Sequence, residues 1–183
     1  VSSNDGVQIK RVLDAGAEGI IVPMITTVEE IQAAADSMFF PPNGKRGVGL
    51  GRAQEYGPGF NKYFYESRER LILIAQIEHC DALQNLEEIF GSGLVDGYIV
   101  GPYDLSCSLG VPGDFEHPDM LAALTQIKES AKKYSVPGGL HVVEPDVQMM
   151  QRSIKSGHQI VIYSVDFRIL EKSLSDAITQ LRG

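Results

Sequence analysis

The sequence predicts an α/β fold built on a parallel β-sheet, because short apolar runs alternate with amphipathic stretches along the chain. Several runs are continuous in Ile, Val and Leu, as expected for strands that are covered on both faces. The runs that qualify as strands are 19–24, 71–78, 95–101, 138–143 and 159–166. Five βα units fit an open flavodoxin-like sheet, and they also fit part of a (β/α)8 barrel. The pattern alone does not choose between the two.

Helical periodicity fills most of the intervening segments. Apolar residues recur at helical spacing in segments 9–17, 28–38, 83–90, 121–131, 147–154 and 169–181. Thr26 or Thr27 is the expected N-cap of the second of these helices, and Asp81 is the expected N-cap of the third. A longer helix is expected to begin after Pro118.

The segment 39–61 differs from the rest because it is rich in Pro and Gly and shows no periodicity. Its cations Lys45, Arg46 and Arg52 could bind a carboxylate or a phosphate, or could make structural or subunit contacts. Its glycines fit neither a P-loop nor a dinucleotide-binding pattern. The segment is therefore expected to be a long, ordered loop, since loops of this length are usually functional or disordered.

Length and composition narrow the class of protein. The 183 residues are 43% hydrophobic, which fits one compact domain over 1–183. The net charge is −8 and no Lys/Arg cluster occurs, which argues against a nucleic-acid partner. No apolar run reaches the roughly 18 residues of a membrane span, and no signal peptide is expected. The two cysteines, Cys80 and Cys107, form no disulfide framework and indicate a cytoplasmic protein with reduced thiols.

The chain begins with Val1 rather than Met and enters a helical pattern almost at once. We therefore expect it to be the middle of a longer protein.

Two acidic residues stand at the ends of predicted strands. Glu78 ends the apolar run 71–78, and Asp104 follows the run 95–101. Catalytic groups in parallel α/β folds lie just past the carboxyl ends of strands. If the two strands are neighbours, the carboxylates lie close together, and a cation such as Mg²⁺ removes their repulsion. The alternative is that both are ordinary loop acids and that Asp104 is an N-cap.

Other polar groups could complete such a site. Gln76 points to the same face of its strand as Glu78, where it would contact a substrate oxygen or satisfy interior backbone. The segment Gly101-Pro102-Tyr103 could present backbone N–H groups to an anion, or could simply be a turn. His141 stands near a strand end and would line the site or remain a core residue. No His pair has zincin spacing, and no GxSxG elbow accompanies Ser164 and Asp166.

Four segments, in order, resemble the HpcH/HpaI family of metal-dependent pyruvate aldolases. The resemblance covers nearly the whole chain, and the QIE and GPxDLS elements are its most specific parts. The family includes 4-hydroxy-2-oxoheptanedioate, 2-dehydro-3-deoxyglucarate and 2-keto-3-deoxy-L-rhamnonate aldolases. The segments read DAGAEGIIVPMITTVEE (14–30), FFPPNGKRGVG (39–49), AQIEHCDALQNLEEI (75–89) and VDGYIVGPYDLSCSLGVPGDFEHP (95–118).

The resemblance implies a TIM (β/α)8 barrel of the phosphoenolpyruvate/pyruvate type. The strands present would be the fourth to the eighth, with about the first three βα units absent. The family's Arg that grips the pyruvate carboxylate, and its Asp and His for proton transfer, would lie in the absent units. Relatives are commonly trimers or hexamers with sites shared between subunits, so a homo-oligomer is implied.

The resemblance also assigns roles to residues. Glu78 and Asp104 match the family's ligands for a divalent metal, which would be Mg²⁺, Mn²⁺ or Co²⁺. Gln76 and the segment 101–103 match substrate-binding positions, although many relatives have Ala where Tyr103 stands. Asp14 matches an acid that is associated with the catalytic His and reaches a neighbouring subunit. His141 replaces an apolar residue that lines the aldehyde pocket in some relatives.

The implied activity is reversible aldol cleavage of a 4-hydroxy-2-oxo acid to pyruvate and an aldehyde. The metal would stabilise the pyruvate enolate as a Lewis acid, and no Schiff-base Lys is expected. One alternative is an enzyme related to the citrate lyase β-subunit or to malyl-CoA lyase. The other is a non-catalytic, truncated barrel that retains only assembly contacts.

Overall fold

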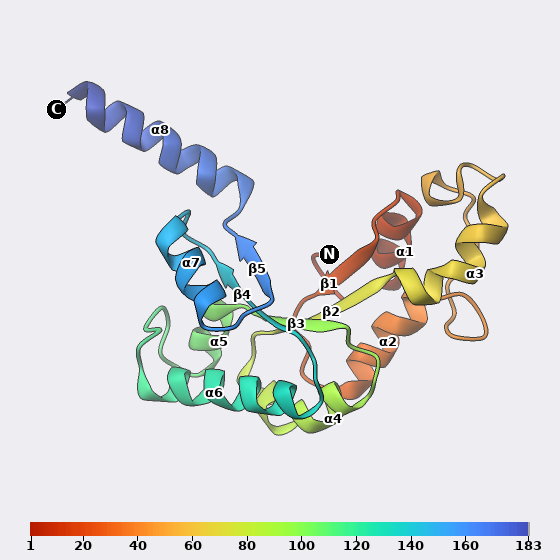
Figure 1. The fold of residues 1–183 in the computed structure, drawn as a ribbon, viewed down its shortest axis with the longest axis horizontal. Coiled ribbons are helices and arrows are strands. Elements are labelled where there is room, and N and C mark those ends of the chain that lie inside the picture. Colours follow the sequence, from red (N-terminus) through yellow and green to blue (C-terminus); the bar gives the residue numbers. More distant parts are fainter. Residues whose placement is uncertain (183) are drawn as a thin grey trace.

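The computed structural model describes residues 1–182 and contains one sheet of five parallel strands. The strands lie in sequence order, each hydrogen-bonded to the next along the chain: β1 (Gly19–Val22), β2 (Ile72–Ile77), β3 (Gly97–Val100), β4 (Gly138–Val142) and β5 (Ile160–Tyr163). A flavodoxin-like sheet reverses its strand order at a switch point, whereas a (β/α)8 barrel keeps sequence order. The predicted α/β fold is therefore confirmed, and the strands follow one another in the sequential order of a barrel (Figure 1).

Helices follow or precede every strand. They are α1 (Gly6–Asp14), α2 (Val28–Met38), α3 (Phe60–Arg70), α4 (Leu86–Gly91), α5 (Pro102–Ser108), α6 (Pro118–Lys133), α7 (Val147–Lys155) and α8 (Asp166–Arg182), with the 3-10 turns η1 (Arg52–Gln54) and η2 (Cys80–Gln84). Thr27 caps α2 in a capping box with Glu30, as the sequence predicted. The prediction that Asp81 is an N-cap is wrong, because His79 caps η2 and its ring accepts the Asp81 N–H.

The two faces of the sheet have different surroundings. Leu73, Ala75 and Ile77 of β2 point outward and are fully buried with core residues of α1, α2, α4 and α6. Their neighbours along β2 point to the inner face, because successive side chains of a strand alternate. On this inner face Ile72 is 49% exposed. Ile72, Ile21 and Ile74 line a shallow cavity of about 250 Å³. The inner face is thus apolar and open toward its amino-terminal end.

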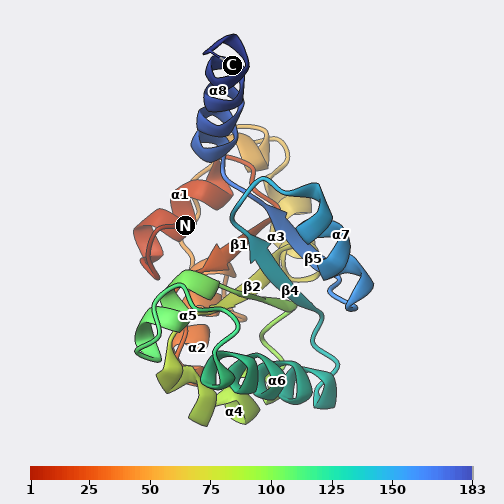
Figure 2. The same cartoon turned by 90° about the vertical axis from the view of Figure 1, so that its left-hand side faces the viewer.

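The last helix lies apart from the body of the molecule. None of the residues of α8 is buried, and both views show it extending away from the sheet (Figures 1 and 2). Phe167, Leu170, Leu174 and Leu181 are all at least 60% exposed along it. Arg168 ties its first turn to the end of β4 through Glu144, with N–O distances of 3.2 and 2.7 Å. No helix in the described residues is long and apolar enough to cross a membrane.

We expect the 183-residue chain on its own to self-associate. β1 and β5 are the two edges of the sheet, and the apolar inner face beside β1 is exposed. Unpaired strand edges are templates for pairing with another chain. Sedimentation velocity should show oligomers that grow with concentration, and Ile72→Glu should reduce them. A chain that stays monomeric and melts cooperatively would contradict this expectation.

Candidate metal and substrate site

Glu78 and Asp104 lie at the carboxyl ends of neighbouring strands. Glu78 directly follows β2, and Asp104 stands in the first turn of α5, just after β3. The strands pair in parallel with Gln76 opposite Ile99, so their ends lie side by side. The two carboxyl groups are close enough for a side-chain contact, and the Asp104 charge also acts on Glu78. The structure therefore brings together the two acids that the sequence singled out.

The Glu78 side chain is buried and is held in place by hydrogen bonds to both of its carboxylate oxygens. It is only 3% exposed, and each of its oxygens accepts a hydrogen bond. Oε1 accepts from the Met24 backbone N–H at 2.9 Å, and Oε2 accepts from the Gln76 amide. Met24 has φ 54°, a left-handed conformation that is uncommon for a residue other than glycine. The ends of two neighbouring strands, β1 and β2, therefore fix the position of this carboxylate.

Gly101 is required by this packing. A methyl group on its Cα would lie 2.4 Å from Glu78 Oε2 and 3.1 Å from Gln76 Nε2. These atoms cannot move away without breaking the hydrogen bonds that hold Glu78. The Gly of the GPYD segment thus allows the β3 end to approach the Glu78 carboxylate closely.

Gly101→Ala is expected to weaken Mn²⁺ binding by roughly 10- to 100-fold, the usual cost of disturbing groups that orient a metal ligand. Isothermal titration with Mn²⁺ would measure this. Gly47→Ala is a matched control, because its methyl group would meet only Lys10 Cε at 3.8 Å. Equal affinities in the two variants would show that Gly101 does not support the site.

The electrostatics of Glu78 reflect its burial. Desolvation raises the pKa of Glu78 above its ordinary value of 4.5. Hydrogen bonds from Met24 and Gln76 lower the pKa, and the neighbouring Asp104 raises it again. The net shift is upward, so burial in the metal-free site makes the charged form of Glu78 less favourable than it is in water. A buried carboxylate with a second carboxylate beside it suits a hard divalent cation, which would offset both the desolvation and the repulsion.

This shift makes metal-free stability depend on pH. Protonation of Glu78 stabilises the folded protein, because the pKa of this carboxyl is higher in the folded state than the unfolded value of 4.5. This contribution to the free energy of unfolding is complete at pH values below 4.5, and it disappears as the pH rises through the folded pKa. We expect the free energy of unfolding in chelator to fall over this window, and to fall less in Glu78→Gln. Urea titrations at a series of pH values would measure both slopes. Identical slopes in the two proteins would contradict the shift.

Of the other expected substrate positions, Gln76 and Gly101 lie against Glu78, whereas Pro102, Tyr103 and His141 border a cavity that includes neither acid. Gln76 shares the inner face with Glu78 and donates to it. Tyr103 packs edge-on against Phe115 at 5.0 Å between ring centres, and it is 44% exposed. Pro102, Tyr103 and His141 border one cavity of about 480 Å³ that continues between α6 and α7. His141 is paired with Ile162 of β5, and its Nε2 lies 3.2 Å from the Ser164 carbonyl oxygen.

Asp14 lies elsewhere in the chain. It is the last residue of α1, where the chain turns toward the start of β1, and its carboxylate is 16% exposed. Arg46 binds it at 2.6 Å, and Lys10 and Gln54 also donate to it. Desolvation raises the pKa of Asp14, but the hydrogen bonds from Lys10 and Arg46 outweigh it and hold the pKa below its usual range. Within one chain, Asp14 is therefore an ion-pair partner of the long loop.

Two features of the site carry no sequence signal that identifies them. The Met24 N–H acts through the backbone, so no side-chain motif marks it. The Arg46–Asp14 pair joins residues 32 positions apart, and only the KRG motif in the glycine-rich segment drew attention to Arg46.

Comparison with known proteins gives consistent matches. Residues 1–172 match the family model described as HpcH/HpaI aldolase/citrate lyase. The chain is 38% identical over 164 residues to the hydroxypyruvate/pyruvate aldolase of Sagittula stellata, covering 89% of this chain and 64% of that protein. It is 36% identical over 179 residues to the 4-hydroxy-2-oxovalerate aldolase of Rhodococcus jostii, covering 96% and 67%. The chain thus spans about two thirds of the length of these curated relatives.

A solved structure shows the same arrangement of elements. A HpcH/HpaI aldolase/citrate lyase family protein from Burkholderia cenocepacia matches with a TM-score of 0.89 at 28% identity. The match covers 99% of this chain and 71% of that one.

Proposed function

Because this chain belongs to the HpcH/HpaI aldolase/citrate lyase family, we propose that the full-length protein is a metal-dependent aldolase. It would cleave a 4-hydroxy-2-oxo acid reversibly to pyruvate and an aldehyde. The observation that carries this proposal is the buried Glu78 carboxylate beside Asp104 at neighbouring strand ends. The names of the relatives, all aldolases of 2-oxo acids, support the reaction class but not one substrate.

The residues fit a divalent cation. Glu78 and Asp104 offer oxygen donors only, as Mg²⁺ and Mn²⁺ prefer, and a cation would relieve both their repulsion and the desolvation of Glu78. Co²⁺ is the third candidate. When bound, the ion supplies Lewis-acid stabilisation of the charge that develops on the keto oxygen of the 2-oxo acid.

The chain's own residues have definite tasks in this proposal. Glu78 and Asp104 hold the cation, while Gln76 and Met24 fix the Glu78 oxygens. The second N–H of the Gln76 amide is available to a substrate oxygen. The backbone of Gly101 and Pro102 would face the pyruvate carboxylate, where the close approach at Gly101 leaves room for no side chain.

The aldehyde side of the site is proposed to involve Tyr103 and His141. Both border the same cavity, and both side chains carry a polar group. They would select the aldehyde rather than take part in the aldol step. Their polar groups favour an aldehyde that carries a hydrogen-bonding substituent.

Partners and assembly also belong to the proposal. Asp14 would act as a catalytic residue in proton transfer at the site of a neighbouring subunit, and its ion pairs with Arg46 and Lys10 would orient its carboxylate there. A homo-oligomer, a trimer or a hexamer, is supported by the exposed apolar side chains of α8. The small-molecule partners are the 2-oxo acid and the aldehyde, and the proposed location is the cytoplasm.

The test is a direct assay of the full-length protein. Purified enzyme is given a panel of 4-hydroxy-2-oxo acids, and released pyruvate is measured with chelator, Mg²⁺, Mn²⁺ or Co²⁺. We expect release only with metal. Acyl-CoA substrates run in parallel, and exclusive cleavage of these would point instead to the lyase branch of the family. No cleavage in either arm would favour a non-catalytic barrel.

A further inference from the structure

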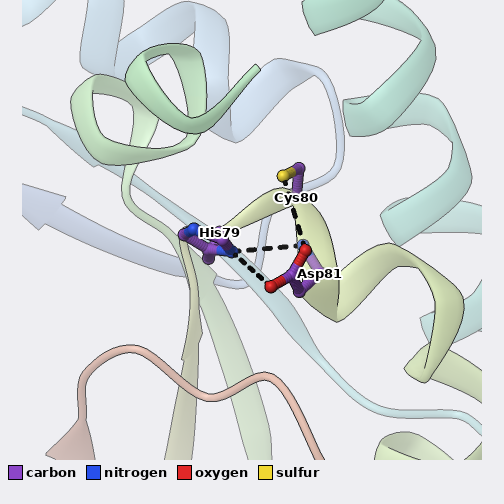
Figure 3. Close-up of side chains that lie close together, drawn as sticks. All are labelled: His79, Cys80 and Asp81. Atoms are coloured by element: carbon purple, nitrogen blue, oxygen red, sulfur yellow. Dashed lines mark hydrogen bonds and ion pairs between the residues drawn. The ribbon is translucent and has the colours of Figure 1, made fainter. Parts of the chain in front are cut away.

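A second group of metal-ligating side chains follows Glu78 directly. His79, Cys80 and Asp81 come from the turn that opens η2, and their donor atoms all lie within 4.8 Å of one another (Figure 3). In the described part of the chain, no other group of three such side chains converges in this way. The proposed aldolase site uses none of the three.

The donors lie within 4.8 Å of one another, somewhat farther apart than the ligands of one tetrahedral ion. His79 Nδ1 lies 3.4 Å from Asp81 Oδ2, and Cys80 Sγ lies 3.8 Å from Asp81 Oδ1. Ligands around Zn²⁺ at about 2.0 Å for N or O and about 2.3 Å for S are separated by about 3.3–3.5 Å. Rotation of the Cys80 and Asp81 side chains would therefore be needed to bring all three donors onto one ion.

The three donors differ in kind from those of the neighbouring carboxylate site. A thiolate and an imidazole favour borderline or soft ions, whereas the oxygen pair of Glu78 and Asp104 favours hard ones. We propose that His79, Cys80 and Asp81 form a separate surface site for a thiophilic divalent cation, of which Zn²⁺ is the best match. Water would complete the coordination, because the Asp81 side chain is 69% exposed.

The backbone of the turn is already fixed. The Cys80 N–H donates to Ser108 Oγ at 2.9 Å, which ties the turn to α5. His79 Nδ1 now accepts the Asp81 N–H at 3.2 Å, and the ion would replace this contact. One backbone hydrogen bond is a small loss beside three coordinate bonds. The Cys80 thiol would bind as the thiolate and release its proton to the buffer.

Co²⁺ is a suitable probe, because thiolate ligation gives it a near-ultraviolet charge-transfer band that oxygen ligands do not give. The full-length protein is titrated with Co²⁺ under oxygen-free conditions, and the band is followed to saturation. We expect one equivalent to produce the band, and one equivalent of Zn²⁺ to abolish it by displacement.

Three variants assign the ligands. Cys80→Ser should remove the band, whereas Cys107→Ser, which changes the other free cysteine, should keep it. His79→Asn preserves an acceptor at the N-cap while removing the imidazole, and it should weaken Co²⁺ binding at least tenfold. Circular dichroism of each variant confirms the fold before titration.

A Glu78→Gln variant separates this site from the aldolase site. It should keep the thiolate band even if it loses all activity, so the two proposals can fail independently. Absence of the band in the unmodified protein would overturn the inference. So would a band that survives Cys80→Ser or disappears in Cys107→Ser.

Discussion

Glu78→Gln in the full-length protein is expected to abolish metal-dependent activity while leaving the fold intact. The substitution keeps the shape of the side chain, so the Met24 N–H still has an acceptor. It removes one of two anionic metal ligands from a site where Glu78 is only 3% exposed. Groups that merely orient a ligand contribute 10- to 100-fold to metal affinity, so loss of the ligand itself should cost at least about 100-fold.

Two measurements separate the metal role from a structural one. Titration with Mn²⁺ reports affinity, and urea denaturation in chelator reports stability. Without metal and near neutral pH, the free energy of unfolding of Glu78→Gln should equal or exceed that of the wild type. The variant no longer buries a carboxylate, and it is this burial that raises the pKa of Glu78.

Asp104→Asn should behave like Glu78→Gln in metal binding, with a smaller effect on stability since Asp104 is exposed. Glu88→Gln, an exposed change on α4, serves as a matched control and should alter neither quantity. Wild-type activity of Glu78→Gln at saturating metal would remove the assignment of this site.

The fold was predictable to the extent that it depends on local pattern. Each of the five apolar runs contains one strand, and the strands are shorter than the runs, as for 159–166 against Ile160–Tyr163. Their order depends on which edges pair across long crossovers, and apolar runs carry no information about that pairing. The family resemblance supplied the barrel, and the sequential order of the sheet is consistent with it.

Helices α3 and α5 were not predicted. α3 begins at Phe60 inside the segment assigned to the loop, and its Phe60, Tyr63 and Phe64 pack on Phe40, outside the main core. α5 has only seven residues, with Leu105 as its one large buried apolar side chain. The aromatic residues of α3 do recur at helical spacing, but they were assigned to the loop with the Pro/Gly-rich stretch before them, whereas α5 is too short to show a repeat.

The candidate site was predictable where side chains at strand ends define it. Glu78 and Asp104 stood out because parallel strands present their carboxyl ends at one edge. The Met24 N–H depends on a left-handed backbone conformation that no local signal required. The ion-pair partner of Asp14 could not be predicted from the sequence either, because tertiary packing determines which residue 32 positions away lies beside it.

Arg46→Met is expected to destabilise the protein strongly. The Arg46 side chain is fully buried, and one terminal nitrogen binds Asp14 at 2.6 Å while the other donates to the Met38 carbonyl oxygen and the Tyr63 hydroxyl. Its guanidinium also lies 4.8 Å from the Phe40 ring centre. Removing one partner of a buried ion pair usually costs about 3–5 kcal/mol. Lys10 still pairs with Asp14, so we expect the lower end of that range.

Variants at both ends of the pair test the cause. Arg46→Lys keeps the charge but loses the fork that reaches Asp14 and Met38 together, and it should recover only part of the loss. The double variant Asp14→Asn/Arg46→Met should lose less stability than the two single variants added together, because each removes the same interaction. Additive losses would show that Arg46 acts through its apolar and aromatic contacts alone.

The pH dependence gives an independent check on the same pair. A carboxyl group with a lowered folded pKa adds stability above its ordinary value of 3.8, and this is lost as the pH falls through the folded pKa. In Arg46→Met the stabilisation that depends on ionised Asp14 should be smaller. The free energies of unfolding of the variant and the wild type should therefore converge as the solution becomes acidic. A difference that stays constant with pH would mean that the charge of Asp14 does not hold the long loop, and that the buried guanidinium fills space instead.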